Sequence, residues 1–191
     1  MTFPQPSVRL LHCVDAFAQL LDSHPPEAQI LSRGSALLGD LIAHDDWLPD
    51  AFAVPQPERY QQYLLHADPK ERFLVVSFVW GPDQATPIHD HTVWGLIGVL
   101  RGAELSQAYA PDSVGHWLPQ GVEHRLEPGQ VEAVSPRIGD VHRVRNAFAD
   151  QVSISIHVYG ANIGKVERSV YLQDGTRKRF VSGYSNASQP A

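Results

Sequence analysis

Two histidines separated by one residue, His89 and His91, are the side chains of this sequence best suited to binding a metal ion. Side chains at positions i and i+2 of a β-strand point to the same face of the sheet. Such a pair can present two imidazoles to one ion, although a strand with one polar face shows the same pattern. His142 lies in a second candidate strand and could supply a third nitrogen. We therefore expect a metal site with His89, His91 and His142 as ligands.

The cysteine content limits the kind of metal site that the chain can build. It has one cysteine, Cys13, against 10 histidines. One cysteine excludes an internal disulfide and a zinc site assembled from thiolates. Metal chemistry in this chain must therefore use imidazole.

A second polar pattern occupies the segment from Val152 to Tyr159, where apolar and polar residues alternate without a break. Its polar face carries Ser155, His157 and Tyr159, which is typical of an antiparallel strand with one solvated face. Residues two apart on one face lie roughly 6.5–7 Å apart. An imidazole can bridge two hydroxyl groups over that distance and orient the phenol. The pattern therefore also allows a relay of hydrogen bonds from Ser155 through His157 to Tyr159.

Helices are predicted for the first fifty residues. Ser7 is a suitable N-cap for an amphipathic helix. The apolar stripe of that helix comprises Leu10, Leu11, Val14, Phe17, Leu20 and Leu21. A second helix is predicted from Pro26 to about His44. The segment from Arg59 to Leu65 is interpreted as a third helical stretch.

After Lys70 the sequence changes to short runs of β-branched and aromatic residues separated by turns, which predicts an antiparallel sandwich or barrel. The runs are Phe73–Trp80, Val93–Leu100, Glu104–Tyr109, Val131–Val134, Val141–Val144 and Val152–Tyr159. Asp174-Gly175 predicts a hairpin near the end of the chain. We expect one domain over residues 1–191. Its predicted parts are a mostly helical region over 1–65, a barrel over 66–182 and a loose tail over 183–191.

Composition narrows the function classes further. The 191 residues include 43% hydrophobic and 19% charged residues, which is enough apolar material for a core. Lys and Arg number 15 against 21 Asp and Glu, and the resulting formal charge of -6 argues against broad binding to nucleic-acid phosphates. No apolar run reaches membrane-spanning length, and no leader pattern is evident at the start. We expect a cytoplasmic protein without a nucleic-acid or membrane partner, and the oligomeric state is not predicted.

The spacing of the histidines resembles that of the metal-binding cupins. One cupin motif has His-x-His followed by a Glu, and the other has Pro-x-Gly-x-x-His-x-x-x-Asn. Here Gly95 stands where the Glu would be, and the segment from Gly139 to Asn146 matches the second motif around His142. Three neutral donors without a carboxylate would leave a divalent ion its charge and several open positions. Such a site suits an anionic substrate that binds the metal beside dioxygen.

Together with the relay, these motifs resemble the cysteine dioxygenase type I family of thiol dioxygenases. The likeness is closest to the bacterial branch that oxidises 3-mercaptopropionate, and it covers roughly residues 55 to 181. The resemblance implies a cupin-type antiparallel β-barrel behind an N-terminal helical region, with Fe(II) held by the three histidines. It also implies that Ser155, His157 and Tyr159 form an outer relay whose tyrosine hydroxyl lies near the iron. The implied reaction combines a small thiol carboxylate with O2 to give the sulfinic acid.

Two differences from the family bear on chemistry and substrate. Many members have a cysteine at the position of Gly95, cross-linked to the active-site tyrosine, so no such thioether is expected here. Eukaryotic members have Tyr-x-Arg, whose arginine pairs with the carboxylate of cysteine. Gln62 stands at that position, and a neutral amide cannot form a charge-assisted bidentate pair. The resemblance therefore favours 3-mercaptopropionate over L-cysteine, without excluding the latter.

Arg168 resembles the arginine that the mercaptopropionate branch offers to the substrate carboxylate. An exposed arginine in a hairpin is the alternative interpretation of this residue. Two other functions also fit the motifs. One is a non-catalytic cupin that senses a metal or a small acid, although no DNA-binding segment accompanies it. The other is a zinc or manganese isomerase or hydrolase, which would typically keep the Glu that Gly95 replaces.

Overall fold

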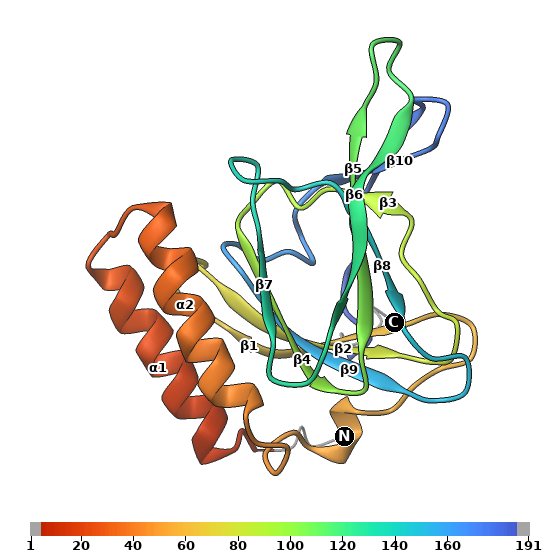
Figure 1. Cartoon of the computed structure of the whole chain (residues 1–191). Helices are drawn as coiled ribbons and strands as arrows, with labels where there is room; N and C mark the ends of the chain where they lie inside the picture. The colour runs from red at the N-terminus through yellow and green to blue at the C-terminus, as the bar shows by residue number, and fades with distance from the viewer. Residues whose placement is uncertain (1–4, 187–191) are drawn as a thin grey trace, which may run out of the picture.

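The computed structural model describes residues 5–186, in which two α-helices precede a barrel of two β-sheets (Figure 1). The helices are α1 (Val8–Asp22) and α2 (Glu27–Ile42), and η1 (Asp50–Phe52) is a short 3-10 helix. The strands are β1 (Gln61–Ala67), β2 (Leu74–Trp80), β3 (Ile88–His89), β4 (Gly95–Arg101), β5 (Glu104–Pro111), β6 (Trp117–Leu126), β7 (Val131–Val134), β8 (His142–Asn146), β9 (Ser153–Tyr159), β10 (Arg168–Tyr171) and β11 (Arg177–Phe180).

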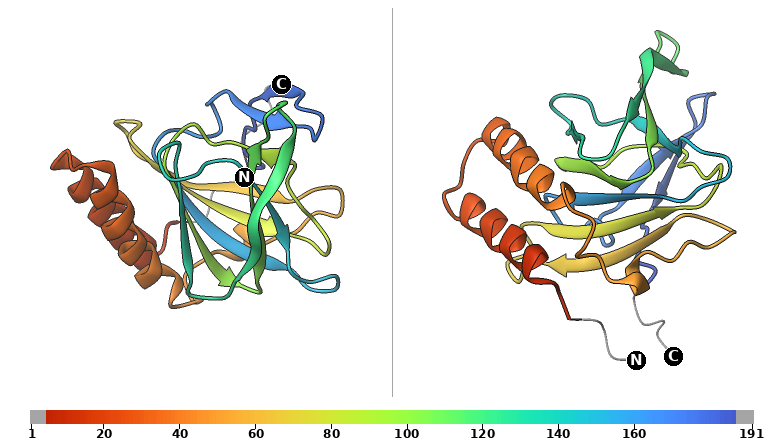
Figure 2. Two further views of the ribbon diagram at one scale, coloured as in Figure 1. Left: turned by 45° about the horizontal axis from the view of Figure 1, so that its top comes forward. Right: turned by 60° about the horizontal axis from the view of Figure 1, so that its bottom comes forward.

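Both helices form where the sequence predicts them. The hydroxyl of Ser7 accepts a hydrogen bond from the backbone N–H of Leu10 at 3.1 Å, as expected of an N-cap. The helices lie side by side on one flank of the barrel, where α2 packs against β4 (Figure 2). Neither helix is long and apolar enough to cross a membrane, and the same holds for every helix within residues 5–186.

The barrel consists of a five-stranded sheet, in the order β1-β2-β9-β4-β7, and a six-stranded sheet, in the order β11-β10-β3-β8-β5-β6. All the strand pairs are antiparallel, which confirms the predicted cupin-type barrel behind a helical region. The register of the six-stranded sheet sets His89 of β3 opposite His142 of β8 and Val170 of β10. In the other sheet, β9 lies between β2 and β4, so its side chains are buried along the whole strand.

One predicted element is wrong. The segment from Arg59 to Leu65, interpreted as helical, contributes instead to strand β1, which pairs with β2. The register shifts between Leu64 and His66, and this irregularity interrupts the two-residue alternation that would identify a strand. Strand β6 was not predicted either, because it is largely exposed and mixes polar residues with Pro119 and Gly121.

The end of the described chain is also more ordered than its polar composition suggests. The backbone N–H of Ser185 donates to the carbonyl of Gln62 at 2.7 Å, and Asn186 bonds to the backbone of Leu64 in both directions. The hydroxyl of Tyr184 accepts from the N–H of Gly164 at 2.8 Å. Residues 183–186 are therefore attached to the barrel, and the remainder of the predicted loose tail lies outside the described residues.

Close packing between α2 and the sheet gives a stability prediction. A Cβ at Gly34 would lie 2.7 Å from Leu96 Cδ1, whereas a Cβ at Gly39 on the same helix would meet nothing within 4 Å. Gly39→Ala should raise the free energy of unfolding by about 0.5–1 kcal/mol through helix propensity. Gly34→Ala gains the same propensity but overpacks the core, which costs about 1–3 kcal/mol. Urea unfolding should therefore rank Gly34→Ala below Gly39→Ala, and equal stabilisation by both would contradict the packing described.

Candidate metal centre

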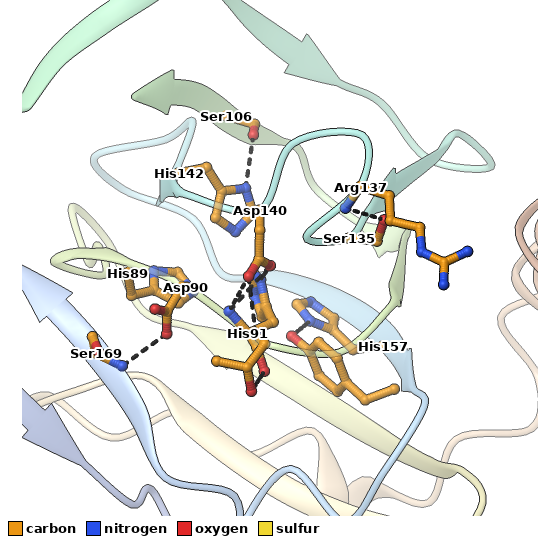
Figure 3. A network of polar contacts seen from close by, with 12 residues as sticks. His89, Asp90, His91, Ser106, Ser135, Arg137, Asp140, His142, His157 and Ser169 are labelled. Carbon is orange, nitrogen blue, oxygen red and sulfur yellow. Dashed lines mark hydrogen bonds and ion pairs between the residues drawn. The ribbon is translucent and has the colours of Figure 1, made fainter. Parts of the chain in front are cut away.

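Three histidines from two distant segments of the chain meet inside the barrel (Figure 3). His89 ends β3, His91 follows two residues later, and His142 begins β8. One ring nitrogen of each lies within 4.8 Å of the others, and the ring centroids are 4.8–5.0 Å apart. Only His89 of the His-x-His pair is part of a strand, so the expected two-residue repeat on one face does not explain the position of His91.

Hydrogen bonds on the outer side of two rings fix which nitrogen faces the cluster. The Nδ1 of His89 lies 3.1 Å from the carbonyl oxygen of Pro87, and the Nδ1 of His91 lies 3.0 Å from Asp140 Oδ1. A carbonyl or carboxylate oxygen can only accept, so both Nδ1 atoms carry the proton. The Nε2 atoms are then the ring nitrogens left for a ligand, and Nε2 of His91 is buried without a hydrogen-bond partner among the described residues. An unpaired buried ring nitrogen of this kind fits a metal ion.

The third ring is held by a chain of polar contacts that reaches the surface. The Nδ1 of His142 lies 3.3 Å from the hydroxyl of Ser106, which donates to Glu132 at 3.3 Å. Glu132 in turn lies 3.1 Å from Nε2 of His124, which is half exposed. The sequence did not link His124 to this site.

Burial favours the uncharged form of two of the imidazoles. Burial first, and the neighbouring His91 second, lower the pKa of His89 to about 3. Burial and the two other rings also hold the pKa of His142 well below its usual range. A neutral imidazole is the form that coordinates a metal, so these two rings are ready to bind one at neutral pH.

Asp140 organises the turn that carries His91. Its carboxylate accepts from the backbone N–H of His91 at 3.1 Å and from that of Thr92 at 2.9 Å, in addition to the ring (Figure 3). Thr92 has a φ of 62°, which is strained for a β-branched residue. Burial raises the pKa of Asp140, but the bonds from His91 outweigh it and hold that pKa below the ordinary value. Asp90, between the two histidines, points away and accepts from the N–H of Ser169 at 2.8 Å.

No carboxylate joins the three-histidine cluster within residues 5–186. Gly95 lies on β4, where an added Cβ would come within 2.9 Å of the Tyr159 ring. The phenol therefore occupies the space that a side chain at this position would need. The lone cysteine is buried in α1 and bonds to the carbonyl of Leu37.

The alternating strand β9 does form a continuous row of hydrogen bonds. The hydroxyl of Ser155 lies 2.7 Å from Nε2 of His157, and Nδ1 of His157 lies 2.8 Å from the hydroxyl of Tyr159. Burial holds the pKa of His157 well below its usual range and raises that of Tyr159. The row is therefore neutral, and its phenol ring stacks against His91 at a centroid distance of 5.4 Å.

A cavity of about 140 Å³ adjoins the cluster and is lined by His89, Tyr159, Gln62 and Arg168 among others. This volume is below the roughly 300–1,000 Å³ of sites for drug-sized ligands. The cavity is therefore suited to a small ligand.

Arg168 is 5% exposed, so it is not the exposed hairpin arginine of the alternative interpretation. Its guanidinium donates to Ser182 at 2.7 Å and stacks over Phe180, yet its Nε has no partner. Gln62 Oε1 is likewise buried and unpaired within the described chain. Unsatisfied polar atoms at one cavity are expected where a polar ligand binds.

All eight residues singled out in the sequence thus gather around one cavity, its adjoining cluster and the relay. Sequence analysis missed the residues that support them, among which Asp140, Ser106 and Glu132 contact the histidines or their partners. Asp140 stands two residues before His142 in the second motif, so its position held a signal. The positions of Ser106 and Glu132 held none, because their contacts depend on the pairing of distant strands.

Part of this chain matches a known protein family, and several solved structures resemble it at low sequence identity. Residues 42–169 match the family described as cysteine dioxygenase type I. A conserved protein with a double-stranded β-helix domain from Klebsiella pneumoniae is 15% identical, with a TM-score of 0.47, covering 71% of this chain and 97% of that one. The TT1209 protein from Thermus thermophilus is 22% identical, with a TM-score of 0.45, covering 59% of this chain and 92% of that one. A cupin domain from Bordetella pertussis is 18% identical, with a TM-score of 0.40, covering 53% and 92%.

The bonds to Asp140 predict a selective effect on metal affinity. Asp140→Asn removes the charge and one of the acceptors that hold His91 and Thr92, so it should weaken metal binding by about 10–100-fold. Asp90→Asn is the matched control, because Asp90 lies between the ligands but its bonds go to Ser169 and Tyr171. Competition with a chelator measures both affinities. Equal losses in the two variants would show that Asp140 has no special role in holding His91.

Proposed function

The chain belongs to the cysteine dioxygenase type I family, and from this premise we propose that it is a non-haem iron thiol dioxygenase that oxidises 3-mercaptopropionate in preference to L-cysteine. The proposed reaction is RSH + O2 → RSO2H. Both oxygen atoms end on sulfur, so no external reductant is required. The observation that carries the proposal is the cavity in which Arg168 and Gln62 lie with His89 and Tyr159.

The proposed ligands of Fe(II) are His89, His91 and His142. Bound iron would supply thiolate binding and the activation of O2. The protein holds the three Nε2 atoms in place through the outer bonds to Pro87, Asp140 and Ser106. These hydrogen bonds position the metal ligands and take no part in the reaction itself.

Arg168 is the proposed partner of the substrate carboxylate. Burial lowers its pKa, but an arginine stays charged at neutral pH. Its free Nε can donate to a carboxylate beside His89, and Gln62 can add a neutral hydrogen bond. The described residues that line this cavity include no Asp or Glu. The ammonium group of L-cysteine would therefore have no anionic partner there, which favours a thiol acid without an amino group.

Tyr159 is the proposed contact to substrate or oxygen, and His157 and Ser155 orient it. Its raised pKa keeps the phenol protonated, so it can donate a hydrogen bond to an anion in the cavity. Exclusion of water from this buried row strengthens that bond.

Oxygen uptake tests the proposed activity. Protein loaded anaerobically with Fe(II) should consume one O2 for each 3-mercaptopropionate, with a higher kcat/KM than for L-cysteine, and NMR should identify the sulfinic acid. Metal-free protein is the control. If the loaded protein binds iron but consumes no O2 with either thiol, the proposed activity is wrong, and a sensor becomes the better account.

Carboxylate recognition can be tested separately at Arg168. Arg168→Gln should lower kcat/KM for 3-mercaptopropionate by about 10–100-fold, since a hydrogen bond to a charged group contributes about 1.5–3 kcal/mol. The loss should be much smaller for 3-mercaptopropanol, which has no carboxylate. Arg179→Gln is the matched control, because Arg179 is exposed and pairs with Glu167. A similar loss for both thiols would argue against a carboxylate contact.

A further inference from the structure

A second cavity adjoins the one beside the histidines and shares three lining residues with it. Its volume is about 290 Å³, against about 140 Å³ for the inner cavity beside His89. The shared side chains are those of Tyr60, Gln62 and Phe180. The outer cavity reaches the surface, because Arg59 in its lining is exposed. The three shared side chains therefore form a partition between the inner cavity and the outer one.

Two residues of the partition are held in place by their neighbours. The ring of Tyr60 packs against Phe78 and Trp80, at centroid distances of 5.9 and 4.8 Å. The backbone carbonyl of Gln62 accepts from the N–H of Ser185 at 2.7 Å, and its N–H donates to the hydroxyl of Ser185 at 2.9 Å. These contacts fix the ring of Tyr60 and the backbone from which Gln62 extends.

The third residue of the partition, Phe180, also positions the arginine of the inner cavity. It is the register partner of Arg168 in the pairing of β11 with β10, and the guanidinium lies 4.6 Å from the centroid of its ring. Ser182 lines the outer cavity and accepts from Nη2 of Arg168 at 2.7 Å. These two contacts leave the buried Nε without a partner among the described residues. Arg168 lines the inner cavity and not the outer one, so a carboxylate bound to it lies on the inner side of the partition.

We propose that Phe180 is a specificity-determining residue, whose ring closes the inner cavity and limits its ligands to short thiol acids. A ligand with its sulfur beside His89 and its carboxylate at Arg168 spans the inner cavity. A longer acid has surplus methylene groups, and the ring of Phe180 blocks their way toward the outer cavity. The limit on ligand size is a property of the two cavities, whereas its consequence for turnover rests on the proposed dioxygenase function.

The outer cavity is chemically suited to the carboxylate of a longer acid. Its described lining residues include no Asp or Glu, and Arg59, Ser182 and Ser185 provide hydrogen-bond donors. Removal of the Phe180 ring should join the two cavities into one space. A longer thiol acid can then keep its sulfur beside His89 while its carboxylate lies among these donors.

Two thiol acids of different length test the limit in the unmodified protein. Anaerobic calorimetry on the Fe(II)-loaded protein gives the Kd of 3-mercaptopropionate and that of 6-mercaptohexanoate, which has three more methylene groups. Added methylene groups ordinarily strengthen binding by removing apolar surface from water. We expect the longer acid to bind at least about tenfold more weakly instead, the effect of a methylene group that a pocket cannot accommodate. Equal or tighter binding of 6-mercaptohexanoate would overturn the proposal.

Variants at Phe180 test whether this ring sets the limit. Phe180→Ala should shift the ratio of the two Kd values by at least about tenfold in favour of the longer acid. Phe180→Leu keeps most of the apolar bulk without the aromatic face, so it should preserve the limit. It should weaken binding of 3-mercaptopropionate by about fivefold or less, as expected from the loss of a cation–π contact with Arg168.

Leu172→Ala is the matched control, because Leu172 lies between β10 and β11 in the same hairpin and lines neither cavity. Its ratio of Kd values should equal that of the unmodified protein. An unchanged ratio in a folded Phe180→Ala protein would overturn the proposal, and so would a shift of the same size in Phe180→Leu or Leu172→Ala. If Phe180→Ala does not fold, the comparison of the two acids in the unmodified protein still decides.

These binding measurements separate the limit on size from the proposed activity. If the protein binds the two acids in the expected order but consumes no O2, the limit stands and the dioxygenase activity is wrong. If it consumes O2 with 3-mercaptopropionate and equally well with 6-mercaptohexanoate, the activity stands and the limit is wrong. Binding of neither acid to the Fe(II)-loaded protein would overturn both.

Discussion

Two of the three imidazoles in this buried space, His89 and His142, are held in the uncharged form that binds a metal ion, and the site depends on this condition. The rings lie 4.8–5.0 Å apart at their centroids. Burial is the largest cause that lowers the pKa of His89 and of His142, and the neighbouring His91 lowers both pKa values as well. Neutrality alone does not orient a ring, because a neutral imidazole has two tautomers. The outer partners decide this, since Pro87 and Asp140 can only accept. The residues around the histidines are therefore as necessary to the geometry as the histidines themselves.

Each of the two sheets contributes a different part of the site. His89 and His142 face each other across β3 and β8 in the six-stranded sheet, whereas Ser155, His157 and Tyr159 follow one strand of the five-stranded sheet. The cavity lies where the sheets meet, so the distance between ligands and phenol depends on how rigidly they pack. The close packing of α2 on the outer face of β4 contributes to that rigidity, because a methyl group at Gly98 would already lie 2.8 Å from Ile42.

Local sequence patterns predicted the helices and most strands, and they drew attention to the three histidines that the fold brings together. The N-cap at Ser7 and the alternation in β9 are short-range signals, and each acts over a few residues. Strand β1 failed because a shift in register between Leu64 and His66 removes the repeat on which such a prediction rests. The burial of Arg168 also needed the fold, since it follows from the pairing of β10 with β3 and β11. Glu104 gave no signal at all, because a single Glu in a strand does not show that the pairing of distant strands buries it completely.

Few of the groups around the histidines and the cavity carry a charge. Burial raises the pKa of Glu104 and of Glu132, which favours their neutral forms, while Asp140 and Asp90 are ionisable groups engaged by backbone N–H donors. Burial holds the pKa of His89 and of His142 below the ordinary value, so both are uncharged, and Arg168 is the cation among the described residues that line the cavity. A divalent ion held by the histidines would therefore find little compensating charge in its ligands. An anionic thiolate with a carboxylate at its other end would supply two negative charges, one for the ion and one for Arg168. On this view the substrate completes the electrostatics of the site.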